Sequence, residues 1–379
     1  MKYTMILMVL ALSLGCAAEL DAAATQKIET APAKPAMDSD TRGKEISDLT
    51  FGMFVCWSFS SFSGYEWTPG VEDINFFAPS GFDADQWVRA AKDAGMNYIL
   101  FLTKHHDGFC LWDTKTTDRK VTKTKFLPVD VLAEVRKACD KHGIKLALYF
   151  SEGDWSWNPK DKGIQRPGLP RPEIKKAQLK ELLTKYGKVE FIWFDHAVGD
   201  GGLSHADTVK WVHSFQPDTF CGFNSGEAAG RLNLRERGKP GRIGDESTIR
   251  NKSHLKSDYS QFKVAEFAYP ILEGQERNVK TKRGAQWFYS LPENDNLCAS
   301  AEKIYRDYLG AKKYGNIFSL DVGPTRAGVL RKIDLATLKK VGQYVRGEIK
   351  LSDEAKASPS LATKKPITAS SVWGNNKKH

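Results

Sequence analysis

Short apolar runs alternate with longer amphipathic stretches along the chain from residue 51 to residue 346. The runs are rich in β-branched and aromatic residues, as buried strands are, and the stretches carry apolar residues at helical spacing. Asp83 begins one stretch and Gly95 ends it, which fits helix-capping chemistry. The pattern predicts strands over 51–59, 98–103, 145–151, 189–194, 219–223, 264–272 and 316–322. It predicts helices over 83–94, 128–142, 172–186, 204–215, 299–313 and 334–346.

Strands that are apolar on both faces and alternate with helices indicate a parallel sheet covered by helices. Seven or eight such units in one domain fit a closed barrel better than an open sheet, and no GxGxxG turn follows the first strand. We therefore expect an α/β fold with a (β/α)8 TIM-like barrel over residues 46–350. The Gly-, Arg- and Asn-rich residues 226–263 predict a long loop within it.

The beginning of the chain departs from this pattern. Lys2, a short apolar run and several small residues predict a secretory signal peptide over residues 1–18. Cys16 stands where bacterial lipoproteins carry their lipidated cysteine, so a lipid anchor at Cys16 and plain cleavage near residues 23–24 are alternatives. Residues 19–45 are rich in Ala, Thr, Pro and Lys and predict a linker. We expect an exported protein that is periplasmic, an outer-membrane lipoprotein or extracellular.

The end of the chain is polar as well. Residues 351–379 are rich in Lys, Ser, Pro and Ala, and they end in KPITASSVWGNNKKH. This ending resembles the first strand of a discoidin-like carbohydrate-binding domain. Since a lone strand does not fold by itself, we interpret the tail as the remnant of such a domain, with an unrelated polar tail as the alternative.

Composition and charge narrow the classes of function. Hydrophobic residues make up 41% of the chain and ten are Trp, which is enough for a large core. The net charge of +10 fits either an anionic polysaccharide as partner or a solvated Lys-rich surface. The lysines are spread along the chain and form no basic stripe with aromatics, so we expect no nucleic acid.

The cysteines and histidines indicate no cofactor. Five cysteines follow Cys16 and none forms a CxxC pair, so we expect small core residues with at least one free thiol. The histidines lack HExxH or a similar ligand spacing, and we predict no metal.

Candidate chemistry gathers where the predicted strands end. The active site of a (β/α)8 barrel lies at the C-terminal ends of its strands. Polar side chains stand at nearly every such end, which predicts a pocket for a polar substrate. These residues are Cys56, His105, His106, Glu152, Asp195, Asn224, Glu273 and Asp321.

One block of these residues resembles a known family. Residues 104–118, KHHDGFCLWDTKTTD, are similar to a hallmark of glycoside hydrolase family 29, the α-L-fucosidases. FGMFVCW (51–57), WFDH (193–196) and SLDVGP (319–324) resemble further segments of that family in the same order. The resemblance extends to about residue 347. It implies a (β/α)8 barrel that hydrolyses terminal α-L-fucose with retention, a carbohydrate substrate and no cofactor.

Retention requires two carboxyl groups about 5–5.5 Å apart, one a nucleophile and the other a general acid and base. Asp195 ends a predicted buried strand, and the resemblance implies that it is the nucleophile. Glu273 follows the strand predicted over 264–272 and precedes an aromatic segment, as the acid/base of the family does. The alternatives are Glu276 and, less favoured, Glu246 and Glu227.

The resemblance also implies a set of sugar-binding residues. His105 and His106 are expected to bind sugar hydroxyls, although adjacent residues on a strand point to opposite sides, so that one histidine can brace a neighbour instead. Glu66 and Trp67 match a loop that contacts fucose. Aromatic residues suit the methyl and the apolar face of fucose. As pocket walls, with the protein core as the alternative, we predict Trp57, Tyr149 and Trp193.

Three departures from the family pattern leave the glycone open. Cys56 replaces the histidine of the first strand, Asp321 replaces an asparagine near the last strand, and His196 follows Asp195 where the family has glycine. They indicate a divergent member. The alternatives to a fucosidase are an α-L-galactosidase, an endo-fucanase, or an inactive barrel that only binds carbohydrate.

Overall fold

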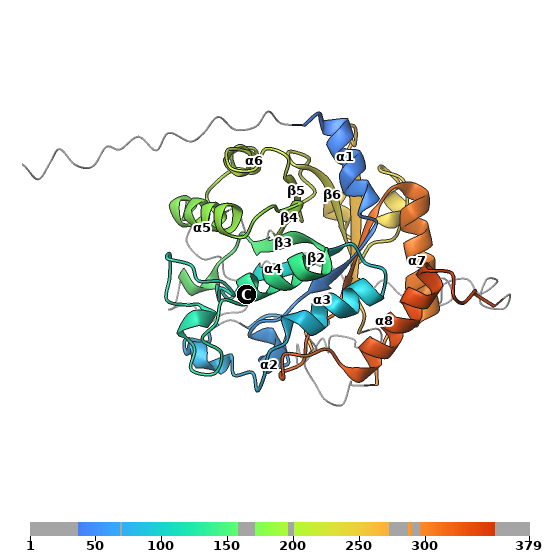
Figure 1. Ribbon diagram of the computed structural model, residues 1–379. Helices are drawn as coiled ribbons and strands as arrows, with labels where there is room; N and C mark the ends of the chain where they lie inside the picture. Colours follow the sequence, from blue (N-terminus) through green and yellow to red (C-terminus); the bar gives the residue numbers. More distant parts are fainter. Residues whose placement is uncertain are drawn as a thin grey trace, which may run out of the picture. The chain divides into compact units, whose positions relative to one another are not determined.

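The computed structural model describes residues 37–68, 70–157, 171–195, 201–272, 287–289 and 296–352 (Figure 1). The predicted signal peptide with Cys16 lies outside the described residues, as do most of the predicted linker and the tail from residue 353. Glu273 and Glu276, the two favoured candidates for the acid/base, also lie outside them.

Eight parallel strands of the described chain form a closed barrel, as the alternating pattern predicted. Each strand pairs with the next along the chain, and the last pairs with the first in the register Phe51↔Phe318. The strand interiors are almost wholly buried, which is why they read as continuous apolar runs. The strands are β1 (Phe51–Val55), β2 (Tyr98–Lys104), β3 (Lys145–Ser151), β4 (Phe191–Asp195), β5 (Phe220–Phe223), β6 (Arg231–Glu236), β7 (Val264–Pro270) and β8 (Ile317–Asp321).

Helices surround the barrel (Figure 1). The longer helices bury apolar side chains in the core. In α3, Trp87, Val88 and Ala91 are buried, and the Asp83 side chain accepts a hydrogen bond from the Gln86 N–H as the N-cap. The described helices are α1 (Ser39–Asp48), α2 (Ser60–Ser63), α3 (Ala84–Asp93), α4 (Val131–His142), α5 (Pro172–Lys185), α6 (His205–His213), α7 (Ala301–Tyr314) and α8 (Lys332–Val345). Short 3-10 turns lie at Ile74–Phe76, Val121–Lys123, Trp155–Trp157, Glu246–Thr248 and Lys252–His254.

Strand β6 lies in the segment predicted as a long loop, so that prediction was wrong. Its sequence, RLNLRE, alternates two leucines with polar residues, and a strand buried in a parallel barrel is not expected to be polar. Two of its polar residues, Asn233 and Arg235, are buried nonetheless. The Arg235 guanidinium donates to the carbonyls of Gly241 and Arg242 at 3.2 and 2.8 Å. The loop after the strand therefore supplies the acceptors that allow a charged residue inside it.

Helix α1 is a second difference, because it begins inside the predicted linker. The Arg42 guanidinium forms a buried ion pair with Glu190 at 2.5 Å and donates to the Asp218 carbonyl at 2.8 Å. The Ser47 hydroxyl donates to the Gly315 carbonyl at 2.9 Å. These partners immediately precede β4, β5 and β8. Helix α1 therefore covers the N-terminal end of the barrel.

Two further sequence predictions concern the thiols and membrane spans. The cysteines within the described ranges are free and four of them are buried, which confirms the prediction of core thiols. Among the helices that the structure describes, none combines the length and the apolar character needed to cross a membrane.

We predict that Arg42→Met destabilises the protein by about 3 kcal/mol, because Glu190 then keeps only the solvent-exposed Lys188 as partner in a buried position. Urea unfolding followed by circular dichroism measures the loss. The matched control is Lys44→Met, which removes an exposed ion pair with Asp48 from the same helix and is expected to change little. Equal losses for the two variants would contradict the role assigned to α1.

Candidate active site

A cavity of about 560 Å³ opens at the C-terminal end of the barrel. It brings together Asp195 and seven of the eight side chains predicted to bind the sugar. Those seven are Cys56, Glu66, Trp67, His105, His106, Tyr149 and Trp193. Asn224, which the sequence placed at a strand end, also lines the cavity. Residues that the sequence did not assign to the site complete the lining: Phe54, Leu102, Ser225, Glu236, Asn251, Trp287 and Phe288.

Trp57 is the eighth predicted side chain, and it does not line the pocket. It is fully buried, packs edge-on against Trp87 and Phe77, and donates its indole N–H to the Thr325 carbonyl. Trp57 is therefore a residue of the protein core, the alternative to the predicted role as a pocket wall. The residue directly before it, Cys56, faces the pocket instead.

Asp195 ends β4, and two neighbouring strands hold its carboxylate. The Tyr149 hydroxyl, from β3, donates to Oδ2 at 2.6 Å, and the Asn224 amide, just after β5, donates to Oδ1 at 3.1 Å. Burial, with Asp195 beside it, raises the pKa of Tyr149 well above its usual value, so the phenol stays a donor. About 18% of the Asp195 side chain is exposed, which leaves the carboxylate both fixed and reachable from the pocket.

Glu236, the last residue of β6, is the second carboxyl group of the pocket. The same Asn224 amide nitrogen that donates to Asp195 also donates to Glu236 Oε2 at 3.1 Å. The two carboxyl oxygens can therefore be no farther apart than these two hydrogen bonds laid end to end. Burial and, after it, the charge of Asp195 raise the pKa of Glu236 to about 7.

The sequence did not single out Glu236 because it was assigned to a loop. The alternation of Leu232 and Leu234 with polar residues, ending in a carboxyl group, was the signal that could have found it. Two alternatives that were weighed, Glu227 and Glu246, are exposed and do not line the cavity. Glu273 and Glu276 lie outside the described residues, so their roles stay predictions.

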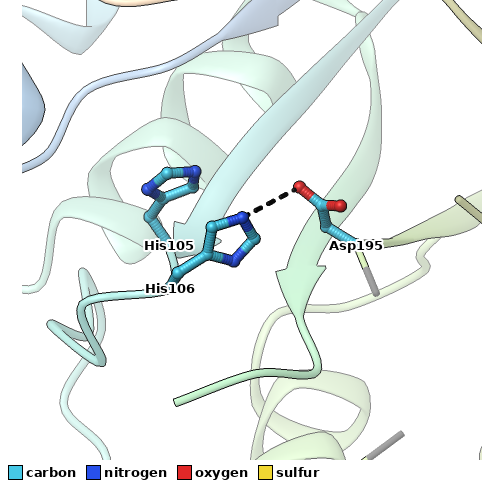
Figure 2. A group of neighbouring side chains, drawn as sticks. All are labelled: His105, His106 and Asp195. Atoms are coloured by element: carbon cyan, nitrogen blue, oxygen red, sulfur yellow. Dashed lines mark ion pairs between the residues drawn. The ribbon is translucent and has the colours of Figure 1, made fainter. Parts of the chain in front are cut away.

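His105 and His106 both line the pocket, beyond the end of β2, where strand alternation no longer separates them (Figure 2). Their rings stack with centroids 4.1 Å apart. Burial lowers the pKa of His106 to about 3, with Lys104 as a second cause, and burial also lowers the pKa of His105 well below its usual value. Both rings are therefore neutral at physiological pH, and His106 Nε2 lies 3.5 Å from Asp195 Oδ2.

The tautomer of His106 follows from its neighbour. The Ser151 hydroxyl donates its single hydrogen to the Gly153 carbonyl at 2.8 Å. It must therefore accept the 2.6 Å hydrogen bond that joins it to His106 Nδ1. His106 Nδ1 carries the proton, and Nε2 presents a lone pair to the pocket.

Aromatic and sulfur atoms form the rest of the wall. Tyr149 and Trp193 stack at 5.4 Å between ring centroids. The Cys56 thiol hydrogen-bonds the carboxyl group of Asp321, which is buried outside the pocket lining. Burial raises the pKa of both groups well above their usual values, so the pair is neutral. Arg237, by contrast, is a cation. Its guanidinium lies over the Trp287 ring, 5.1 Å from the ring centroid, and 3.8 Å from the Glu66 carboxylate.

The family model for α-L-fucosidases matches residues 19–348. The chain belongs to the α-L-fucosidase family. Alpha-L-fucosidase 1 of Arabidopsis thaliana is 29% identical over 346 residues, which are 86% of this chain and 62% of the plant protein. Tissue alpha-L-fucosidase of Mus musculus is 22% identical over 82% of this chain and 71% of its own length. The chain thus spans about three fifths of the plant relative.

Solved structures of α-L-fucosidases share the fold. Isoenzyme 1 from Paenibacillus thiaminolyticus aligns with a TM-score of 0.64 at 24% identity, over 82% of this chain and 76% of that one. AlfC from Lactobacillus casei, in complex with α-L-fucose product, aligns with a TM-score of 0.61 at 21% identity, over 81% and 98% of the two chains.

A third carboxyl group contacts the pocket of this α-L-fucosidase family member from the barrel interior, through a pocket-lining residue. Glu266, on β7, is fully buried and accepts a hydrogen bond from the Trp193 indole at 3.3 Å. Burial raises its pKa to about 7 from an ordinary value of 4.5. The folded protein therefore keeps a proton on Glu266 that the unfolded chain releases at lower pH.

This raised pKa predicts how stability changes with pH. Between pH 4.5 and about 7 the folded state binds the extra proton, so the contribution of Glu266 falls as pH rises through this window and is constant above it. Glu266→Gln should flatten the slope by up to about 1.4 kcal/mol per pH unit. Urea unfolding at several pH values measures how the free energy of unfolding depends on pH. Glu134→Gln, at a partly exposed position, is the control. Parallel curves for wild type and Glu266→Gln would refute the prediction.

Proposed function

We propose that the chain is a retaining exo-α-L-fucosidase that releases terminal α-L-fucose from glycans or fucose-containing polysaccharides. The single observation that carries the mechanism is the Asn224 amide shared by Asp195 and Glu236 at 3.1 Å each. Asp195 Oδ1 and Glu236 Oε2 can be no farther apart than these two hydrogen bonds end to end, which supports a retaining arrangement rather than the about 6.5–9.5 Å separation of inverting enzymes. Family membership supplies the class of glycone.

In the first step a carboxylate oxygen of Asp195 attacks the anomeric carbon and the glycosidic C–O bond breaks. Glu236 is our candidate for the general acid, because its pKa near 7 keeps the proton that the leaving oxygen takes up. In the second step Glu236, now anionic, takes a proton from water. The water oxygen bonds to the anomeric carbon, the ester to Asp195 breaks, and fucose leaves with its configuration retained.

The remaining lining suits a deoxysugar bound in a pocket. His106 Nε2 can accept a hydrogen bond from a sugar hydroxyl, and Glu66 adds a carboxylate. Tyr149, Trp193 and Trp287 offer rings to the methyl group and the apolar face. The related Lactobacillus casei enzyme, whose structure contains α-L-fucose as product, supports the same glycone here. The predicted signal peptide over residues 1–18 supports action outside the cytoplasm.

One observation favours a second glycone, α-L-galactose. The Cys56 side chain in the pocket is shorter than the histidine expected from the family pattern, which leaves room for one additional hydroxyl group on the sugar. Aryl α-L-galactosides belong beside aryl α-L-fucosides in the first assay. Turnover of neither would favour an endo-acting fucanase or a barrel that only binds carbohydrate.

We predict that Asp195→Ala abolishes hydrolysis of an aryl α-L-fucoside, because no atom then attacks the anomeric carbon. Azide should restore part of the rate and form a β-fucosyl azide, since a small anion fits the space that the carboxylate leaves. Asp258→Asn, an exposed loop substitution, serves as control. Full activity of Asp195→Ala would exclude Asp195 as the nucleophile.

Glu236→Gln and Glu273→Gln together identify the acid/base. Loss of the acid should slow substrates with poor leaving groups by about 10²–10⁴-fold and spare those with strongly activated aryl groups. We expect this pattern for Glu236→Gln, together with a kcat/KM that falls above about pH 7 in the wild type. The same pattern in Glu273→Gln, with Glu236→Gln active on every substrate, would return the role to Glu273.

A further inference from the structure

His105, His106 and Asp195 offer three ligand atoms that lie within 4.8 Å of one another in the pocket (Figure 2). The histidines follow β2 and the aspartate ends β4, so two strands of a rigid barrel fix the group. Two imidazoles and one carboxylate are a donor set that holds Zn²⁺ with a fourth position open, and other first-row ions use it as well.

The gap between His106 and Asp195 has the character of a cation site. Ser151 fixes the proton of His106 on Nδ1, so a lone pair on Nε2 faces the carboxylate oxygen Oδ2 at 3.5 Å. Two acceptors without a hydrogen between them favour a cation or a donor in the intervening space. An ion with bonds of about 2.0–2.2 Å to both atoms spans this separation at an angle close to tetrahedral.

His105 supplies the third ligand after a small rotation. Its ring lies against that of His106, with an interplanar angle of 28°. Its Nδ1 is buried and has no hydrogen-bond partner among the described residues, so no hydrogen bond at that nitrogen restrains the ring. Rotation of the ring brings this ligand atom within metal–ligand bonding distance, since the three atoms lie within 4.8 Å of one another and two such bonds cover about 4.0–4.4 Å.

The charged groups around these three ligand atoms favour the binding of a divalent cation. Glu66 lines the same pocket and adds a carboxylate near the ion. Two cations near the pocket have acidic partners: Lys104 is paired with Asp154 at 3.3 Å, and Arg237 lies 3.8 Å from Glu66. Ser151 orients the His106 ring, and Tyr149 orients the Asp195 carboxylate, as outer partners do at metal centres.

We propose that the pocket also binds one divalent transition ion, Zn²⁺ or Cu²⁺, held by His105, His106 and Asp195, and that this ion excludes the sugar. The ion is an inhibitor and takes no part in hydrolysis. Only the competition rests on the proposed function, because it requires the sugar to occupy the same place. Mg²⁺ and Ca²⁺ prefer oxygen ligands and should not bind here.

Calorimetric titration of the full chain, free of any polyhistidine tag, tests the site directly. With ZnCl2 we expect one strong site per chain, a loss of at least roughly tenfold in affinity for His106→Gln, and no strong site in His105→Gln/His106→Gln. The matched control is His142→Gln, which removes a histidine lying 2.8 Å from Asp85 outside the pocket and should bind as the wild type does. Absence of strong binding, unchanged binding in the double variant, or equal binding of MgCl2 would overturn the proposal.

Steady-state kinetics test the exclusion of the sugar. Zn²⁺ should raise the apparent KM for an aryl α-L-fucoside and leave kcat unchanged, and EDTA should not lower the activity. Inhibition of kcat at constant KM would place the ion elsewhere and overturn the competition. If the wild type hydrolyses no α-L-fucoside, the proposed function fails, while the calorimetric result still decides whether the metal site exists.

Discussion

The Asn224 amide group, placed between two carboxyl groups, is the interaction on which the rest of the site depends. A single nitrogen donates to Asp195 and to Glu236, so it holds two acids together in a pocket where their charges would repel each other. Asp195 receives a second donor from Tyr149, whereas burial favours the proton on Glu236. The two carboxyl groups thus have different surroundings, which supports the different roles proposed for them.

The barrel explains why these groups meet. Tyr149, Asp195, Asn224 and Glu236 come from four consecutive strands, β3 to β6, at or just beyond their C-terminal ends. Neighbouring strands lie about 4.8 Å apart, and β5 lies between β4 and β6, so acids that end β4 and β6 can both reach a donor that follows β5. The order of the strands therefore explains why Asp195 and Glu236 share Asn224.

Much of this could be read from the sequence, because most strands are apolar and end in a conspicuous polar group. The barrel, Asp195 and the histidine pair were predicted in this way, whereas Glu66 and Trp67 of the pocket were predicted from the resemblance to a family loop. Strand β6 escaped prediction because its burial relies on hydrogen bonds from Arg235 to loop carbonyls, which no periodicity reveals. Glu236 escaped with it. Trp57 and Cys56 are adjacent, and only the direction of the chain after β1 decides which of them faces the pocket.

Helix α1 has a consequence for how the molecule can be presented on a surface. The ion pair of Arg42 and the hydrogen bond of Ser47 hold this helix against the N-terminal end of the barrel, opposite the pocket. A lipid anchor at Cys16, as predicted from the sequence, would attach the chain on the side of α1, at the end of the barrel opposite the pocket, and leave the mouth of the pocket facing outward. Glycans approaching from the surrounding medium would then reach Asp195 without passing between the protein and its support.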